Sequence, residues 1–283
     1  SVAWAIDGTI ILYGVILAAA CVGSIAVVAT DRPQKTWSLT FTASPQHALS
    51  FAFLSIVAAV VVLFGCVTLA KMFMADVYAR TALAAYTEQN HDRVMTLFQK
   101  AVYLNHNEGR YYTLVAQYGL DRATQETQKP QDRQNRDVIA TAVTSAAGAA
   151  RMGGDLMPND VLAHEVKGLV LENSGGYVQG AASEALAAYQ RAGALEPHNP
   201  QLDIAMGRMY LTQAQAMTGE DARQERTQIV ENAKKVFLAA RDKTTFSYGT
   251  DTASLFAPAH YYLATVDEAL GNMDDAIAAM RMA

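Results

Sequence analysis

Six histidines are the side chains in this sequence best suited to bind a metal or to move protons, so their spacing is the first test for catalytic chemistry. The six are His47, His91, His106, His164, His198 and His260. No two of them stand three or four residues apart, the spacing that places two ligands on one face of a helix, and no cysteine lies nearby. The spacing therefore predicts no metal site and no other cofactor, and most of these histidines are expected at helix boundaries or packing positions.

Motifs that carry catalysis are also missing from the sequence. It contains no Gly-x-Ser-x-Gly elbow, no phosphate-binding glycine loop and no dinucleotide-binding fingerprint. The glycine-rich stretch NSGGYVQG, residues 173–180, follows no predicted strand and is typical of a loop insertion. Catalysis needs a nucleophile, base or charge clamp within hydrogen-bond reach of a reacting atom, and the candidate residues here are scattered. We therefore expect no catalytic residues in this segment alone; His47 is the histidine that we would test.

Two long apolar stretches near the start of the chain are the strongest structural signal. Residues 9–29 and 48–70 contain no charged side chain, and each is long enough to cross a hydrocarbon layer that needs about 20 helical residues. The first stretch lacks the basic flank and cleavage site of a signal peptide, which is the alternative. The sequence therefore predicts a membrane region at residues 1–70 with two transmembrane helices.

Charge and cysteine content exclude some functions. The formal net charge is −5, and the excess acid lies after residue 70, which argues against a nucleic-acid partner. Cys21 and Cys66 both lie inside the apolar stretches, at different expected depths, so a disulfide between them is not expected. Basic residues on either side of the second stretch balance each other, so they do not indicate which side of the membrane carries the rest of the chain.

Residues 71–283 show a recurring helical register. An aromatic residue is followed three positions later by alanine in the pairs Phe98 with Ala101, Tyr189 with Ala192, and Phe237 with Ala240. Small residues at fixed positions let paired helices approach closely, as in tetratricopeptide repeats, which are helix pairs of about 34 residues. The register predicts an all-α chain with a tetratricopeptide-repeat solenoid; an unrelated helical bundle is the alternative. The five predicted units are residues 75–108, 109–160, 161–199, 200–250 and 257–283, the last incomplete.

Tyrosines on the first helices of these units are the candidate binding residues. First helices line the concave face of such solenoids, so we expect Tyr78, Tyr112, Tyr210 and Tyr261 to contact a protein partner in a groove. Simple packing is the alternative role for the same side chains.

Several stretches in this order resemble a known family. They are SLTFTASPQHALSFAF, KMFMADVYARTAL, YLNHNEGRYYTLVAQ, MPND, ENSGGYVQGA and ALEPHNPQL. Together they resemble the C-terminal part of O-antigen ligase-like membrane proteins with tetratricopeptide repeats, of the type found in candidate phyla radiation bacteria. The resemblance implies a multi-pass protein of the bacterial cytoplasmic membrane that transfers or polymerises lipid-linked glycans. The family's catalytic residues belong to a loop upstream of this part, so none can be assigned here.

The sequence therefore predicts a membrane-anchored interaction module of a longer protein, since the chain starts at Ser1 without methionine and ends within an amphipathic pattern. Its expected partners are a protein in the repeat groove, membrane lipid and the lipid-linked glycan machinery. The alternative is a free-standing membrane-anchored scaffold with no link to glycans. Glycosyl transfer is expected only of the full-length protein.

Overall fold

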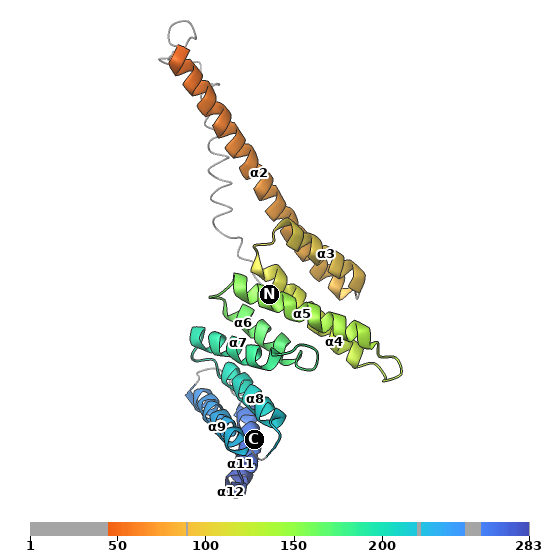
Figure 1. Ribbon diagram of the computed structural model, residues 1–283, viewed down its shortest axis with the longest axis vertical. Coiled ribbons are helices and arrows are strands. Elements are labelled where there is room, and N and C mark those ends of the chain that lie inside the picture. Colours follow the sequence, from red (N-terminus) through yellow and green to blue (C-terminus); the bar gives the residue numbers. More distant parts are fainter. Residues whose placement is uncertain (1–44, 89, 220–221, 247–255, 283) are drawn as a thin grey trace. The chain divides into compact units, whose positions relative to one another are not determined.

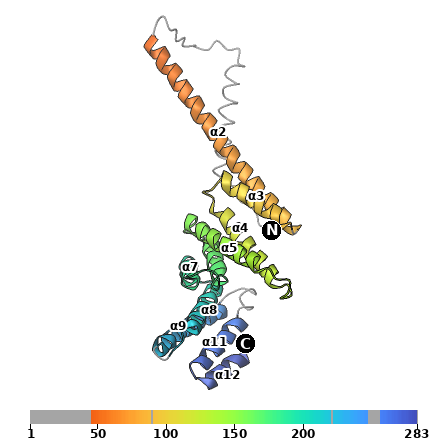
Figure 2. The ribbon, with the colours of Figure 1, turned by 45° about the vertical axis from the view of Figure 1, so that its right-hand side comes forward.

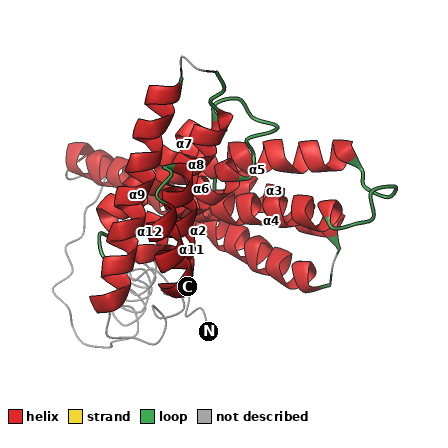
Figure 3. Cartoon of the chain, turned by 90° about the horizontal axis from the view of Figure 1, so that it is seen from below, coloured by secondary structure: helices red, strands yellow, loops and turns green. Residues whose placement is uncertain are grey.

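The computed structural model describes residues 45–88, 90–219, 222–246 and 256–282. All regular secondary structure in these ranges is helical (Figure 3). The all-α prediction is confirmed for this part of the chain. The first predicted membrane helix, residues 9–29, lies outside it.

The second predicted membrane helix lies within α2 (Pro45–Thr87), which has 43 residues. The segment Ala52–Thr87 is long and apolar enough to cross a membrane, with a mean hydropathy of 2.7 in a window of which no part is buried. It is the one such helix among the described residues, so the two-helix membrane region stays a prediction. The chain divides within α2, between Gly65 and Cys66, into two units. The sequence does not mark this position. The helix itself continues past residue 70.

Nine further helices follow α2 in the unit Cys66–Ala283, as far as the structure describes it (Figures 1 and 2). They are α3 (His91–Leu104), α4 (Gly109–Thr127), α5 (Arg136–Leu156), α6 (Val161–Glu172), α7 (Ala181–Leu195), α8 (Pro200–Ala216), α9 (Arg223–Phe246), α11 (Phe256–Ala269) and α12 (Met273–Met282). Each of the pairs α4 with α5, α6 with α7, α8 with α9, and α11 with α12 packs together, and each pair also contacts the next.

Asparagine and aspartate side chains explain where several helices begin. A side-chain oxygen at these positions accepts hydrogen bonds from backbone N–H groups of the first turn, which have no partner within the helix. The capping residues are Asn90 before α3, Asn135 before α5, Asp160 before α6 and Asn199 before α8. Pro200 follows Asn199 at the first position of α8, where a missing N–H costs nothing.

In two of the pairs a glycine lies directly against an aromatic ring of the partner helix. A Cβ added to Gly168 of α6 would lie 2.6 Å from the ring of Tyr189 in α7. A Cβ added to Gly207 of α8 would lie 2.4 Å from the ring of Phe237 in α9, a residue with no exposed surface. These glycines therefore let the aromatic rings fill the space between the two helices, as the recurring register predicts.

Apolar clusters connect each pair to the next. Two clusters join the second half of α2 to α3 and α4, another extends from α4 to α8, and a further one, which we call the α8–α11 cluster, joins α8, α9 and α11. Because each cluster includes residues of successive helices, the core is continuous along the repeats and does not form a single centre, which is the packing of a solenoid.

Ion pairs also cross between successive pairs of helices. Glu172 of α6 accepts hydrogen bonds from Tyr189 at 2.8 Å and from Arg208 of α8 at 3.0 Å. Lys234 of α9 donates to Asp267 of α11 at 2.5 Å, and Asp267 is only 5% exposed. Removing the cation from such a contact would leave a buried carboxylate without compensation.

A candidate partner groove between α3, α4 and α5

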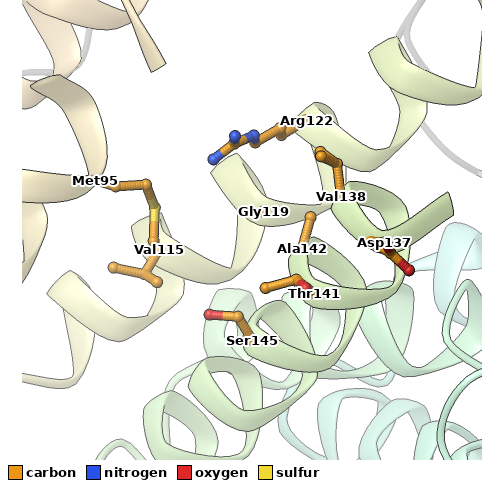
Figure 4. A pocket seen from close by; sticks show the side chains of 9 residues that line it. All are labelled: Met95, Val115, Gly119, Arg122, Asp137, Val138, Thr141, Ala142 and Ser145. Atoms are coloured by element: carbon orange, nitrogen blue, oxygen red, sulfur yellow. The ribbon is translucent and has the colours of Figure 1, made fainter. Parts of the chain in front are cut away.

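An open pocket of about 270 Å³ lies between α3, α4 and α5 (Figure 4). One side is Met95 of α3, and the rest comes from α4 and α5. The lining residues are Met95, Val115, Gly119, Arg122, Asp137, Val138, Thr141, Ala142 and Ser145. We call this pocket the α3–α5 groove.

Small side chains explain why the groove is there. Gly119 of α4 lies so close to α5 that an added Cβ would be 2.9 Å from the Cβ of Ala146. The lining positions on α5 include Ala142 and Ser145, so this helix presents a shallow surface towards α3. Because α4 and α5 approach closely and their side chains are short, Met95 does not fill the space in front of them.

Two charged side chains border the groove without pairing with each other. Among the described residues, the Arg122 guanidinium has no hydrogen bond or ion pair, and the carboxylate of Asp137 has none either. Figure 4 shows the two side chains pointing in different directions. Asp137 lies in the first turn of α5, where the helix dipole favours a negative charge. Arg122 is therefore a cation available to an acidic group that enters the groove.

The lining of the groove suits the binding of an apolar side chain. Its lining combines apolar side chains with the hydroxyls of Thr141 and Ser145. No group of three or more His, Cys, Asp or Glu residues that could hold a metal occurs in the described part of the chain. The arrangement can hold an apolar side chain next to a carboxylate.

Two of the histidines, His91 and His164, make hydrogen bonds in the packing of the helices. The Nδ1 atom of His91 lies 2.8 Å from the hydroxyl of Tyr118, which joins the start of α3 to α4. The Nε2 atom of His164 lies 3.1 Å from the carbonyl oxygen of Pro158. His47 lies in the first turn of α2.

The four predicted tyrosines lie on four different helices. Tyr78 of α2 is half-buried, with the Lys100 ammonium 5.6 Å from its ring centre, and Tyr210 of α8 is partly buried against the α8–α11 cluster. Tyr112 of α4 is half-buried three residues before Val115, which puts it on the same side of α4 as the α3–α5 groove. Their role as partner contacts stays a prediction.

Tyr261 of α11 lines a second open groove of about 460 Å³, which we call the α11–α12 groove. Its ring is 52% exposed, and Met273, Ile277 and Met280 of α12 share the lining and are about as exposed. Tyr261 is thus the one of the four for which a groove position is described.

The residues of the α3–α5 groove were not predicted. Val115, Arg122 and Ala142 belong to no motif, and the space between α3 and α5 depends on how three helices pack. The run of small residues from Ala142 to Gly154 was the available signal, because such a helix leaves a shallow face.

Comparisons with known proteins now complement this geometry. No protein-family model and no curated protein matches the chain. A crystal structure of MamA protein is similar with a TM-score of 0.53 and 12% identity, and the match covers 74% of this chain and 89% of that one. TTC0263, a thermophilic TPR protein in Thermus thermophilus, is similar with a TM-score of 0.43, 16% identity and coverage of 74% and 91%. The Arabidopsis OM64 TPR domain gives a TM-score of 0.37, 19% identity and coverage of 49% and 96%.

The helix packing and the first of these neighbours define the class of fold. The described part of the chain is all-helical, with a solenoid like that of tetratricopeptide-repeat proteins, as the recurring register predicted. At these identities the likeness concerns the fold. The comparisons give no support to the membrane and O-antigen ligase part of the predicted resemblance.

Proposed function

We propose that this chain is a membrane-anchored interaction module that holds a segment of a protein partner in the α3–α5 groove. The observation that carries the proposal is the groove itself, an apolar surface next to an unpaired cation that the packing of the repeats leaves open. The tetratricopeptide-like fold supports it, because stacked helix pairs present extended surfaces to partners. The apolar and exposed first half of α2 supports the anchoring.

The chemistry of the groove defines the partner segment. Met95, Val115 and Ala142 suit an apolar side chain of the partner, and Arg122 suits a carboxylate close to it in sequence. The tyrosines Tyr78, Tyr112, Tyr210 and Tyr261 would extend the contact along the first helices. A segment with one large apolar residue beside an acidic residue fits this surface.

A finer proposal concerns the biological setting. The resemblance of the quoted motifs supports a place beside the machinery that transfers lipid-linked glycans in the bacterial cytoplasmic membrane, in a multi-pass protein. The rival proposal is a free-standing scaffold for another membrane complex. The sequence of the whole gene distinguishes them, because many further membrane segments upstream favour the ligase-like protein and a start codon near Ser1 favours the scaffold.

A photocrosslinking experiment tests the groove. Ser145 lines the groove, whereas the neighbouring Thr144 is exposed on α5 but does not line it. With a benzophenone amino acid at position 145, we expect one defined protein adduct in native membranes, and at position 144 we expect none. Ala142→Leu fills the groove and should abolish the adduct at position 145. Equal adducts at both positions, or an adduct that survives Ala142→Leu in a folded protein, would refute the proposal.

A further inference from the structure

The α11–α12 groove is an apolar surface that no described helix covers. It lies between α11 and α12, which run side by side and are joined by residues 270–272 (Figure 2). Four large side chains in its lining are each at least half exposed: Tyr261, Met273, Ile277 and Met280. Exposed apolar side chains that gather in one groove are typical of an interaction surface, whereas single ones are common on any protein.

The corresponding surface of the earlier pairs is covered by the next pair. Met280 stands four residues after a buried alanine, as Tyr189 does in α7 and Phe237 in α9. Tyr189 shares an apolar cluster with Leu202 of α8, and the ring of Phe237 stacks on Tyr262 of α11 with 5.1 Å between the ring centres. Both rings are almost fully buried, but Met280 is 55% exposed. The α11–α12 pair therefore offers a surface of the kind that a packed helix covers elsewhere in this chain.

The charged side chains of the groove lie at its two ends and differ in sign. Glu268 lies one residue before the end of α11, and Arg281 lies one residue before the end of α12. Because the short connection makes the two helices antiparallel, Glu268 lies beside Met273 at the start of α12, and Arg281 lies eight residues, or about 12 Å of helix, further along. Asp274 and Asp275 add negative charge at the Glu268 end. Neither Glu268 nor Arg281 has an ion pair within the described part of the chain.

We propose that the α11–α12 groove binds the α11–α12 groove of a second copy of this chain, about a two-fold axis. In a contact of this symmetry, a residue i of one copy meets a residue j of the other, and j meets i. An axis through the middle of the groove exchanges its ends, so Glu268 of each copy faces Arg281 of the other, and the two acidic ends lie apart. Ile277 is midway between Met273 and Arg281 in α12, so the two Ile277 side chains meet near the axis. A second copy is the occupant that fits, because the charges of this groove are complementary to themselves.

This contact goes beyond the proposed function and leaves its site free. The linings of the α11–α12 groove and the α3–α5 groove share no residue. A dimer therefore carries two α3–α5 grooves, and it holds a partner with two binding segments more tightly than one copy does. The protein that Tyr261 contacts is then a second copy of the chain.

A charge exchange tests the two-fold contact in the whole chain, solubilised in detergent micelles. Glu268→Arg alone and Arg281→Glu alone each bring like charges together at both ends of the contact, so the dissociation constant of the dimer should rise at least about ten-fold. In an equimolar mixture of the two variants, the facing charges differ in sign at both ends, so association should return. The chain that carries both changes should associate for the same reason. Sedimentation in density-matched detergent measures the mass, and circular dichroism checks that each variant is folded.

A cysteine crosslink tests where the two copies meet. The whole chain, with Cys21 and Cys66 changed to serine, carries Ile277→Cys or, as a matched control, Ala278→Cys. Ala278 is the next residue of α12 and is exposed, but it does not line the groove. Under mild oxidation, we expect Ile277→Cys to form a disulfide-linked dimer several-fold faster than Ala278→Cys.

Three results would overturn the inference. They are a monomeric parent protein, a mixture of the two charge variants that associates no better than either variant alone, and equal crosslinking rates at positions 277 and 278. A monomer whose position 277 is protected from a thiol reagent would show that another part of the full-length protein, or another protein, covers the groove, and the second copy would be the wrong occupant. None of these results bears on the α3–α5 groove, which photocrosslinking at position 145 tests separately.

Discussion

Gly207→Ala tests whether the contact between glycine and an aromatic ring determines the packing of the α8–α9 pair. The new Cβ would lie 2.4 Å from two carbons of the Phe237 ring, whereas nonbonded carbons prefer about 3.5 to 4.0 Å. The ring must therefore retreat by more than about 1 Å. It has no exposed surface and stacks on Tyr262 with 5.1 Å between the ring centres, so little free space is available.

A matched control separates this clash from helix propensity. Gly148 lies in the middle of α5, is exposed, and has no heavy atom within 4 Å of an added Cβ. Gly148→Ala should stabilise the protein by about 0.5 to 1 kcal/mol, because alanine loses less backbone freedom on folding. Gly207→Ala gains the same stabilisation of the helix, but the added methyl group overpacks the core. The difference between the two variants is therefore the overpacking cost, about 1 to 3 kcal/mol.

Urea unfolding followed by circular dichroism measures both variants against the parent protein. We expect Gly148→Ala to raise the midpoint and Gly207→Ala to lower it, with similar slopes. If Gly207→Ala is as stable as Gly148→Ala, the Phe237 ring is not confined against α8 and the assigned repeat register is wrong.

Three further predictions concern the solenoid as a whole, one core alanine and one ion pair. A fragment that begins at Asp76 should be soluble and strongly helical by circular dichroism, and a spectrum dominated by strand or coil would contradict the solenoid. Ala192→Trp, at a site with no exposed surface, should cost about 1 to 3 kcal/mol or more, and an unchanged melting temperature would count against the register. The hydrogen bonds from Arg151 lower the pKa of Glu184, so this pair should stabilise the protein above the ordinary glutamate pKa and lose that effect as the pH falls through the lowered value. The Arg151 and Glu184 side chains are 34% and 41% exposed, so solvent screens the stabilisation by this pair. Between about pH 5 and about pH 3, the Glu184→Gln variant should therefore lose less stability than the parent protein. An identical loss in both proteins would show that the pair does not contribute.

The repeats could be predicted from sequence because their packing is local. Gly168 with Tyr189 and Gly207 with Phe237 come from neighbouring helices joined by short loops, and in both units an alanine follows the aromatic residue three positions later. The boundary of the membrane part was less visible. The second apolar stretch and the first repeat helix are one continuous α2, and nothing in the sequence interrupts it between residues 70 and 71.

The candidate binding surface could be predicted only in part. Tyr261 lines the α11–α12 groove, and its contact with a partner stays a prediction. The α3–α5 groove was missed because its depth depends on the gap between helices from two different pairs. Arg122 belongs to no sequence motif, and its place in the groove depends on how α4 and α5 pack.

The ion pairs between successive helix pairs have a consequence for how such an array can evolve. Repeat proteins change length when whole units are duplicated or lost. Loss of the α8–α9 pair would remove Arg208 and Lys234 together, and Glu172 and the buried Asp267 would each lose their cation. A buried carboxylate without a partner is strongly destabilising, so such a deletion would need compensating changes in both neighbouring units. The charged side chains of each unit therefore match those of its neighbours, and the units cannot be exchanged or deleted without compensating changes.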